Sequence, residues 1–187
     1  MGLSTIKNLS KNSGLAVSLS EAKAQCYIVE NDLTNDALLT SLIKAAQVII
    51  EESPSVPFVF FENTFEAIFD ATGSLIRLPK MPVKSVDSVE LYNGTDWTET
   101  SDYTAELGDT MAFVIMPSLK GQDTTKVKII FTAGESDAEN IRYDAKQLVL
   151  LNVANLFDNR SAIDTKALSE NPLGYSAILK NFQYYNF

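Results

Sequence analysis

Few residues of this chain have the types and spacing that catalysis or metal binding requires. The sequence contains no histidine and one cysteine, Cys26. Histidine-containing triads, histidine-ligated metal sites, imidazole acid–base catalysis and intrachain disulfides are therefore excluded. None of the 8 glycines lies in a GxxxxGK[ST] or GxGxxG phosphate-binding pattern, so nucleotide chemistry has no support. We expect a protein that is not an enzyme and that holds no cofactor and no metal.

Three oxygen-bearing residues have the spacing of the first ligands of a calcium loop. Asp32, Thr34 and Asp36 alternate with other residues. Positions six and twelve of such a loop must be Gly and Glu, whereas this chain has Ala37 and Ile43 there. The pattern indicates instead the solvated start of a helix.

A denser acidic run, Glu135, Asp137 and Glu139, precedes a stretch of helical periodicity. Carboxylates at such a bend can bind a divalent cation or supply an acid–base pair. Acidic residues just before a helix also face the positive end of its dipole favourably, which is the simpler interpretation. An enzyme that uses Glu135, Asp137 or Asp144 is the weakest alternative.

The only tryptophan, Trp97, lies among acidic residues, namely Asp96, Glu99 and Asp102. An exposed aromatic ring beside carboxylates can form a carbohydrate platform. A loop aromatic that packs at the end of a hairpin is the commoner arrangement. A carbohydrate-binding β module therefore remains an alternative of a different class.

Aromatic residues crowd the last six positions, which hold Phe182, Tyr184, Tyr185 and Phe187. Chain ends are normally polar and frayed, whereas Tyr and Phe are enriched in the cores of interfaces. Docking on the chain's own domain and docking on another subunit both explain the cluster. We expect these four residues to form a partner or subunit interface.

The bulk composition describes an acidic globular protein. The chain has 187 residues, 45% of them hydrophobic, and a formal charge of −9. Tight DNA binding is not expected, because phosphate neutralisation requires clustered Lys and Arg. The longest apolar runs, Leu148–Leu151 and Phe58–Phe61, are far shorter than the roughly 20 residues of a membrane helix. We expect no membrane segment.

Helical periodicity occurs at both ends of the chain. Ser18 and Glu21 fit a capping box that starts a short helix ending near Tyr27. A second helix follows before Pro54, with a stripe formed by Leu38, Leu39, Leu42, Ile43, Ala45, Ala46, Ile49 and Ile50 and with Thr40, Lys44, Gln47 and Glu51 opposite. Asn140–Asn159 is apolar almost all round, which is typical of a central helix that other helices cover.

The middle of the chain has the short runs and turn residues of β-structure. Asn93–Gly94 suits a tight turn with positive φ. Seven strands are predicted: Phe58–Phe61, Thr64–Phe69, Ser74–Leu78, Ser85–Tyr92, Tyr103–Leu107, Met111–Met116 and Lys126–Thr132.

These elements predict an α+β fold, in which a small helical bundle of two N-terminal helices and one long C-terminal helix carries an inserted antiparallel β sub-domain. The predicted parts are an N-terminal extension (1–17), a helical core (18–54 and 135–162), the β sub-domain (55–134) and a C-terminal tail (163–187).

Six stretches follow one another in an order that matches a known family: SLSEAKAQCYI (Ser18–Ile28), NDALLTSLIKAAQVIIEE (Asn35–Glu52), LPKMPVKSVDSVELY (Leu78–Tyr92), KIIFTAGESDAENI (Lys128–Ile141), KQLVLLNVANLFDNR (Lys146–Arg160) and NPLGYSAILKNF (Asn171–Phe182). In this order they resemble the head-tail connector family of tailed bacteriophages, the adaptor proteins that form a ring beneath the portal. Asn152 and Asn155 depart from the family's more apolar last helix.

The resemblance implies a structural subunit of the virion neck, made in the cytoplasm of a bacterial host. Copies of the chain, commonly twelve, would form a ring that contacts the portal protein and the next neck or tail protein. Double-stranded DNA would pass through this ring without tight binding, and a ring charge of roughly −108 for twelve copies fits that role. A tail-completion or tail-terminator subunit is the alternative within virion proteins.

Overall fold

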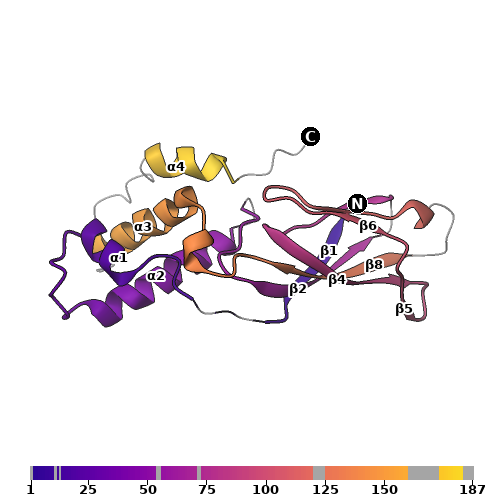
Figure 1. Ribbon diagram of the computed structural model, residues 1–187, viewed down its shortest axis with the longest axis horizontal. Coiled ribbons are helices and arrows are strands. Elements are labelled where there is room, and N and C mark those ends of the chain that lie inside the picture. Colours follow the sequence, from indigo (N-terminus) through magenta and orange to yellow (C-terminus); the bar gives the residue numbers. More distant parts are fainter. Residues whose placement is uncertain are drawn as a thin grey trace. The chain divides into compact units, whose positions relative to one another are not determined.

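The computed structural model describes residues 2–10, 12, 14–53, 56–70, 73–119, 125–159 and 173–182. The chain folds into two compact units. Unit 1 consists of Met1–Asn12 and Phe61–Glu135, and unit 2 consists of Ser13–Phe60 and Ser136–Phe187. Unit 1 contains all the strands and unit 2 the α-helices (Figure 1). The predicted α+β class with an inserted antiparallel region is confirmed.

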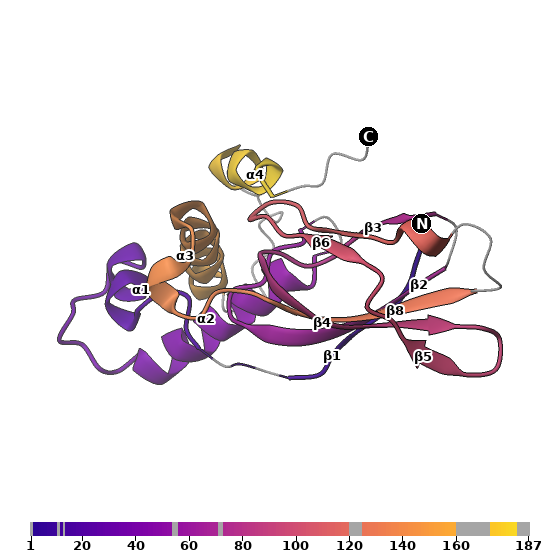
Figure 2. The ribbon, with the colours of Figure 1, turned by 45° about the vertical axis from the view of Figure 1, so that its right-hand side comes forward.

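Unit 1 contains two antiparallel sheets. The larger has the strand order β1-β2-β8-β4-β5, and the smaller has the order β3-β7-β6. In Figure 2 the long strands β2, β8 and β4 lie side by side in the larger sheet. The strands are β1 (Leu3–Asn8), β2 (Asn63–Asp70), β3 (Leu75–Arg77), β4 (Val83–Tyr92), β5 (Trp97–Glu99), β6 (Thr104–Glu106), β7 (Phe113–Ile115) and β8 (Lys126–Ala133).

Period-two alternation builds the core of unit 1. Alternate residues of β2 and β8 are buried, and Phe65 stacks on its cross-strand partner Phe131 with ring centroids 5.6 Å apart. Ile76 of β3 and Val114 of β7 are also fully buried. This pattern is the reason why six of the seven predicted strands are found close to their expected positions.

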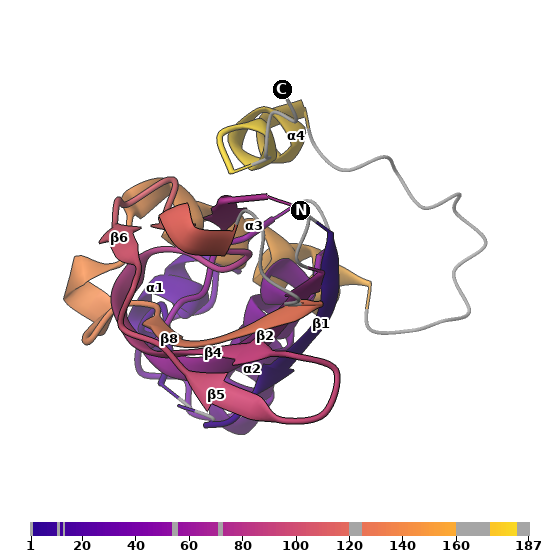
Figure 3. The ribbon, with the colours of Figure 1, turned by 90° about the vertical axis from the view of Figure 1, so that its right-hand side faces the viewer.

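The observed strands differ from the seven predicted ones in three places. Phe58–Phe61 is buried but forms no strand, and Phe61 makes an isolated bridge to Glu135, because a continuous apolar run indicates burial and not a ladder. Residues 3–8, assigned to an extension, form the edge strand β1 beside β2 (Figure 3). Strand β5 was missed as well, since it has only 3 residues.

Unit 2 is built from α1 (Leu19–Gln25), α2 (Asp36–Glu51), α3 (Tyr143–Asp158) and α4 (Leu173–Lys180). The predicted capping box is present, since the Ser18 hydroxyl accepts from the Glu21 backbone and the Glu21 carboxylate accepts from the Ser18 backbone. Helix α3 is central, because α1, α2 and α4 all pack against it (Figure 1). Ile43 of α2 and Leu148 of α3 are both fully buried.

Helix α4 lies in the segment that was expected to be a tail. It packs on α3, where the Asn152 side-chain amide donates to the Tyr175 hydroxyl at 3.2 Å. Both residues are almost fully buried. The polar residue that departs from the family's apolar helix therefore has a structural role, because it satisfies the hydroxyl of the helix that covers it.

Candidate assembly surfaces

Of the four aromatic residues predicted to form an interface, the structure describes only Phe182. Phe182 follows α4 and is only 7% exposed. Its ring makes an edge contact with Phe58 at 5.4 Å and lies under the Arg142 guanidinium at 4.7 Å. Phe182 thus packs within its own unit, and its role at a partner interface stays a prediction. Tyr184, Tyr185 and Phe187 lie outside the described residues.

The acidic residues considered above as possible metal ligands form ion pairs or hydrogen bonds within the fold. Glu135 pairs with Lys84 at 2.6 Å, and Asp144 pairs with Arg142 at 2.6 Å. Asp137 accepts from the hydroxyl of its neighbour Ser136. In the part of the chain that the structure describes, no group of three or more His, Cys, Asp or Glu side chains is arranged to hold a metal ion. Nor is any described helix long and apolar enough to cross a membrane.

Trp97 packs at the end of the β4–β5 hairpin. Its ring lies 5.0 Å from that of its cross-strand partner Tyr92. The ammonium group of Lys128 lies over the Trp97 ring at 4.9 Å and pairs with Glu90 at 2.6 Å. The ring is therefore engaged within its own sheet, which is the packed-hairpin arrangement and not an open platform.

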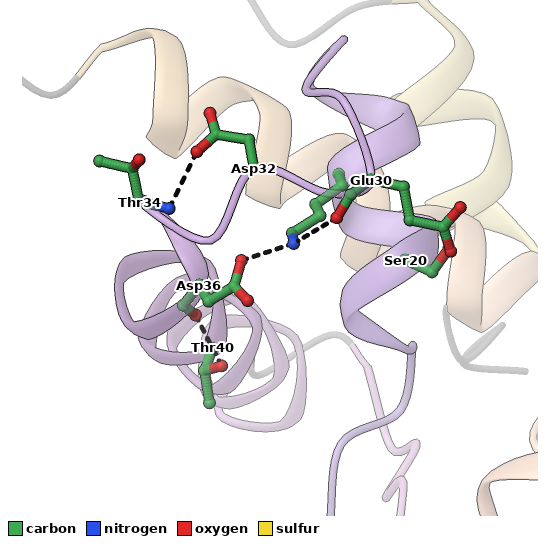
Figure 4. A network of polar contacts seen from close by, with 7 residues as sticks. Ser20, Glu30, Asp32, Thr34, Asp36 and Thr40 are labelled. Atoms are coloured by element: carbon green, nitrogen blue, oxygen red, sulfur yellow. Dashed lines mark hydrogen bonds and ion pairs between the residues drawn. The ribbon is translucent and has the colours of Figure 1, made fainter.

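A buried lysine organises the loop between α1 and α2, residues 26–35, which we call the α1–α2 loop. Lys23 is 4% exposed, and its ammonium group pairs with Asp36 at 2.6 Å and donates to the Glu30 carbonyl at 2.9 Å (Figure 4). The Asp32 carboxylate accepts from the Thr34 backbone at 2.9 Å. The Thr34 side chain and, after it, this backbone bond lower the pKa of Asp32. The polar network fixes the loop at both ends.

The second residue of the α1–α2 loop has a strained backbone. Tyr27 has φ of +56°, and the bonds from Tyr27 N to Ala24 O and from Ile28 N to Lys23 O form a Schellman motif. Glycine is usual at this position, because a side chain in the left-handed region costs about 1–2 kcal/mol. Tyr27 is 98% exposed, and the other large exposed side chains of the loop are Val29 and Leu33, each at 73%.

A second apolar surface lies on α2. Ala45, Val48 and Ile49 are exposed together with Lys44, and we call these four residues the outer face of α2. Val48 is 47% and Ile49 49% exposed. Gln47 was expected on the polar side of the helix, but its side chain is buried. Its amide group is satisfied there, since it accepts from Ala16 N at 3.1 Å and donates to Gly14 O at 3.3 Å.

Sequence analysis did not identify either surface. Ala45 and Ile49 belong to the apolar stripe that was assigned to the core, and Tyr27 was treated only as the end of a helix. The available signal was the width of the stripe on α2, since a helix that packs on one side needs an apolar arc of about 100°. The stripe on α2 contains more apolar residues than such an arc requires.

Comparisons with known proteins identify the fold. No protein-family model and no curated protein sequence matches the chain. A chain in the neck of an empty gene transfer agent (GTA) particle, computed with C6 symmetry, superimposes with a TM-score of 0.75 at 18% identity and covers 98% of this chain and 97% of that chain. A chain of the native GTA virion gives 0.74 at 18% identity, covering 97% and 96%.

A third solved structure, the neck of the native GTA particle computed with C12 symmetry, gives a TM-score of 0.70 at 19% identity over 98% of this chain and 97% of that chain. Both units take part, because almost the whole of each chain is covered. The predicted resemblance to phage-type neck proteins is confirmed at the level of the fold.

Proposed function

We propose that this chain is a structural head-tail connector subunit. Copies of it form a ring that joins the portal vertex of a tailed phage-like particle to the next neck or tail protein and lines the passage of the DNA. One observation carries the proposal, namely the superposition with GTA neck chains over 97–98% of this chain. A shared fold across both units is more specific than a match to one common sub-domain.

The symmetry of the solved necks supports a ring. They were computed with C6 and C12 symmetry, and both are compatible with a closed ring of twelve copies. The charge of this chain supports DNA passage, because a ring of subunits at −9 each repels phosphate and discourages adhesion of DNA in transit. The role requires no catalysis, and we propose that the chain is not an enzyme.

The three aromatic residues Tyr184, Tyr185 and Phe187 are proposed to bury against a neighbouring subunit or partner. Burial of a large aromatic side chain contributes about 1.5–3 kcal/mol, whereas ordering the backbone of each residue costs about 1–2 kcal/mol. Such a segment is held only where a partner supplies an apolar groove. Deleting Gln183–Phe187 should therefore leave the melting temperature within about 2 °C and reduce incorporation into particles. A large loss of stability would contradict this role.

The alternatives differ in position and in ligand. A tail-completion or tail-terminator subunit would contact a tail tube and not a portal. A carbohydrate-binding module would need an open aromatic platform, and Trp97 is already engaged by Tyr92 and Lys128. No contact in the described residues favours either alternative over a connector.

Cryo-electron microscopy of purified particles tests the function. Density for this chain should form a ring directly against the portal, and native mass spectrometry of the recombinant ring should give about 247 kDa for twelve copies of 20.6 kDa. A ring at the far end of the tail tube would instead support the terminator. Absence of the chain from the particle would overturn the proposal.

A further inference from the structure

A closed ring of identical subunits requires a heterologous contact, in which one patch of each subunit meets a different patch of the next. If the chain forms a ring as proposed above, each copy must carry two separate complementary surfaces. Unit 2 presents two apolar surfaces at different places along α2. The α1–α2 loop precedes Asp36, the first residue of the helix, whereas Val48 lies about 18 Å further along the helix axis.

The α1–α2 loop exposes side chains that its own unit does not need. Tyr27 adopts a costly backbone conformation and is 98% exposed, so its ring contributes almost nothing to the core. The buried pair of Lys23 and Asp36 nevertheless fixes both ends of the loop. A strained, fully exposed aromatic residue on an ordered loop points to a function outside its own fold. Preorganisation of this kind lowers the entropy cost of binding.

The charges of the two surfaces are complementary. Glu30 and Asp32 make the α1–α2 loop acidic, and neither pairs with a cation among the described residues. Lys44 is an exposed cation on the outer face of α2 and makes no ion pair within the same described set. In a chain with 24 acidic and 15 basic residues, a cation beside exposed Val48 is a specific feature. Opposite charges at an interface fix its register and suppress wrong partners.

We infer that the α1–α2 loop of one copy docks on the outer face of α2 of the next copy, with the Glu30 carboxylate beside the Lys44 ammonium group. The apolar contact joins the exposed side chains of the two surfaces, Tyr27, Val29 and Leu33 on one copy and Ala45, Val48 and Ile49 on the other. Stable interfaces bury about 800 Å² per partner, so this contact forms the centre of a larger one. The inference rests on the proposed ring.

Charge reversal tests this contact directly. Lys44→Glu should lower the fraction of subunits in rings on the order of tenfold, because it places two carboxylates together. Adding Glu30→Lys to Lys44→Glu should return the fraction to within about threefold of the unmodified chain, since the pair is restored in the opposite sense. Glu30 is chosen because its side chain makes only a 3.3 Å hydrogen bond to Ser20. Mass photometry at a fixed subunit concentration measures the fraction, and circular dichroism melting checks folding.

Two controls separate a specific contact from a general charge effect. Lys126→Glu makes the same charge change at the exposed first residue of β8 in unit 1 and should leave ring formation nearly unchanged. Glu30→Lys combined with Lys126→Glu has the same composition as the rescue variant but should lower ring formation, because it places two cations together at the contact. Tyr27→Asn gives a further measurement: Asn tolerates the left-handed region, so the melting temperature should hold while ring formation falls.

Each outcome decides a separate question. If the unmodified chain forms rings and Lys44→Glu forms them equally well, the subunit contact lies elsewhere, and the inference is wrong while the proposed function stands. The same holds if Lys126→Glu is as damaging as Lys44→Glu, or if Glu30→Lys fails to rescue Lys44→Glu. If the unmodified chain forms no ring, either alone or in purified particles, the proposed function fails and the contact fails with it.

Discussion

Gly134 is the residue at which one methyl group should do the most damage in unit 1. It ends the FTAG turn just before the chain leaves this unit, and its φ is +116°. A Cβ atom at Gly134 would lie 2.1 Å from the Phe61 carbonyl oxygen and 2.7 Å from the Glu62 nitrogen. Both obstacles are backbone atoms, which β-type bonds such as Glu62 N to Glu135 O hold in place.

The expected loss for Gly134→Ala has two parts. Holding an L-residue at this φ costs about 1–3 kcal/mol, and displacing packed backbone costs about 1–3 kcal/mol more. A total near 3–4 kcal/mol corresponds to a melting temperature lower by about 6–16 °C for a chain of this size. Urea unfolding followed by the fluorescence of Trp97, the only tryptophan, measures the stability of unit 1 directly.

Two other glycines of unit 1 provide matched controls. Gly94 has φ of +100° with nothing within 4 Å of its Cβ position, so Gly94→Ala should show only the conformational cost of about 1–2 kcal/mol. Gly73 has neither a positive φ nor a close neighbour, so Gly73→Ala should change stability by less than about 0.5 kcal/mol. If Gly134→Ala costs no more than Gly94→Ala, the close approach to Phe61 does not exist and the argument fails.

Three further predictions concern unit 2. Lys23→Met should destabilise the chain by about 2–3 kcal/mol in urea unfolding, because Asp36 loses its cation. Removing one partner of a buried ion pair usually costs about 3–5 kcal/mol, and the loss is smaller here since the Asp36 side chain is 28% exposed. An unchanged urea midpoint would refute the network. Phe182→Ala should cost about 3 kcal/mol by the same measurement, whereas a partner-facing ring would cost nothing. Ser18→Ala should cost about 1 kcal/mol at pH 7. The Ser18 hydroxyl and backbone lower the pKa of Glu21 below its ordinary value of 4.5, so the stability from this box is present above pH 4.5 and is lost as the pH falls through the lower folded pKa. The difference in melting temperature between Ser18→Ala and the unmodified chain should therefore shrink from pH 7 to pH 3. The part that remains comes from the bond of Glu21 N to the Ser18 hydroxyl, which does not titrate.

The parts of the fold that sequence reasoning predicted are those with one strong period and a local signal. The capping box at Ser18 located α1, and alternation located β2 and β8. The order of these segments, together with the resemblance, gave the α+β fold. Its weakest point was β1, because Leu3–Asn8 is exposed along almost its whole length and therefore has no apolar alternation. Only pairing with β2 makes it a strand.

The exposed surfaces of unit 2 were missed for a related physical reason. The aromatic residues of the tail attracted attention because of their type, but Phe182 is used within its own unit. Tyr27 and Leu33, which are 98% and 73% exposed, lie in a segment whose composition is ordinary. Their exposure depends on the left-handed turn at Tyr27 and on the burial of Lys23, and local sequence patterns predict neither feature.

Helix α2 carries more apolar side chains than packing within its own unit covers. Its apolar residues cover more than one side, and the partner in the same unit, α3, decides which of them are buried. Ile43 and Ile50 face the core, whereas Ile49 is left exposed, and the polar Gln47 is turned inward to hold residues 14–16. The proposed contact between copies accounts for the exposure of Val48 and Ile49 beside Lys44. A ring of the proposed kind requires that contact in every copy.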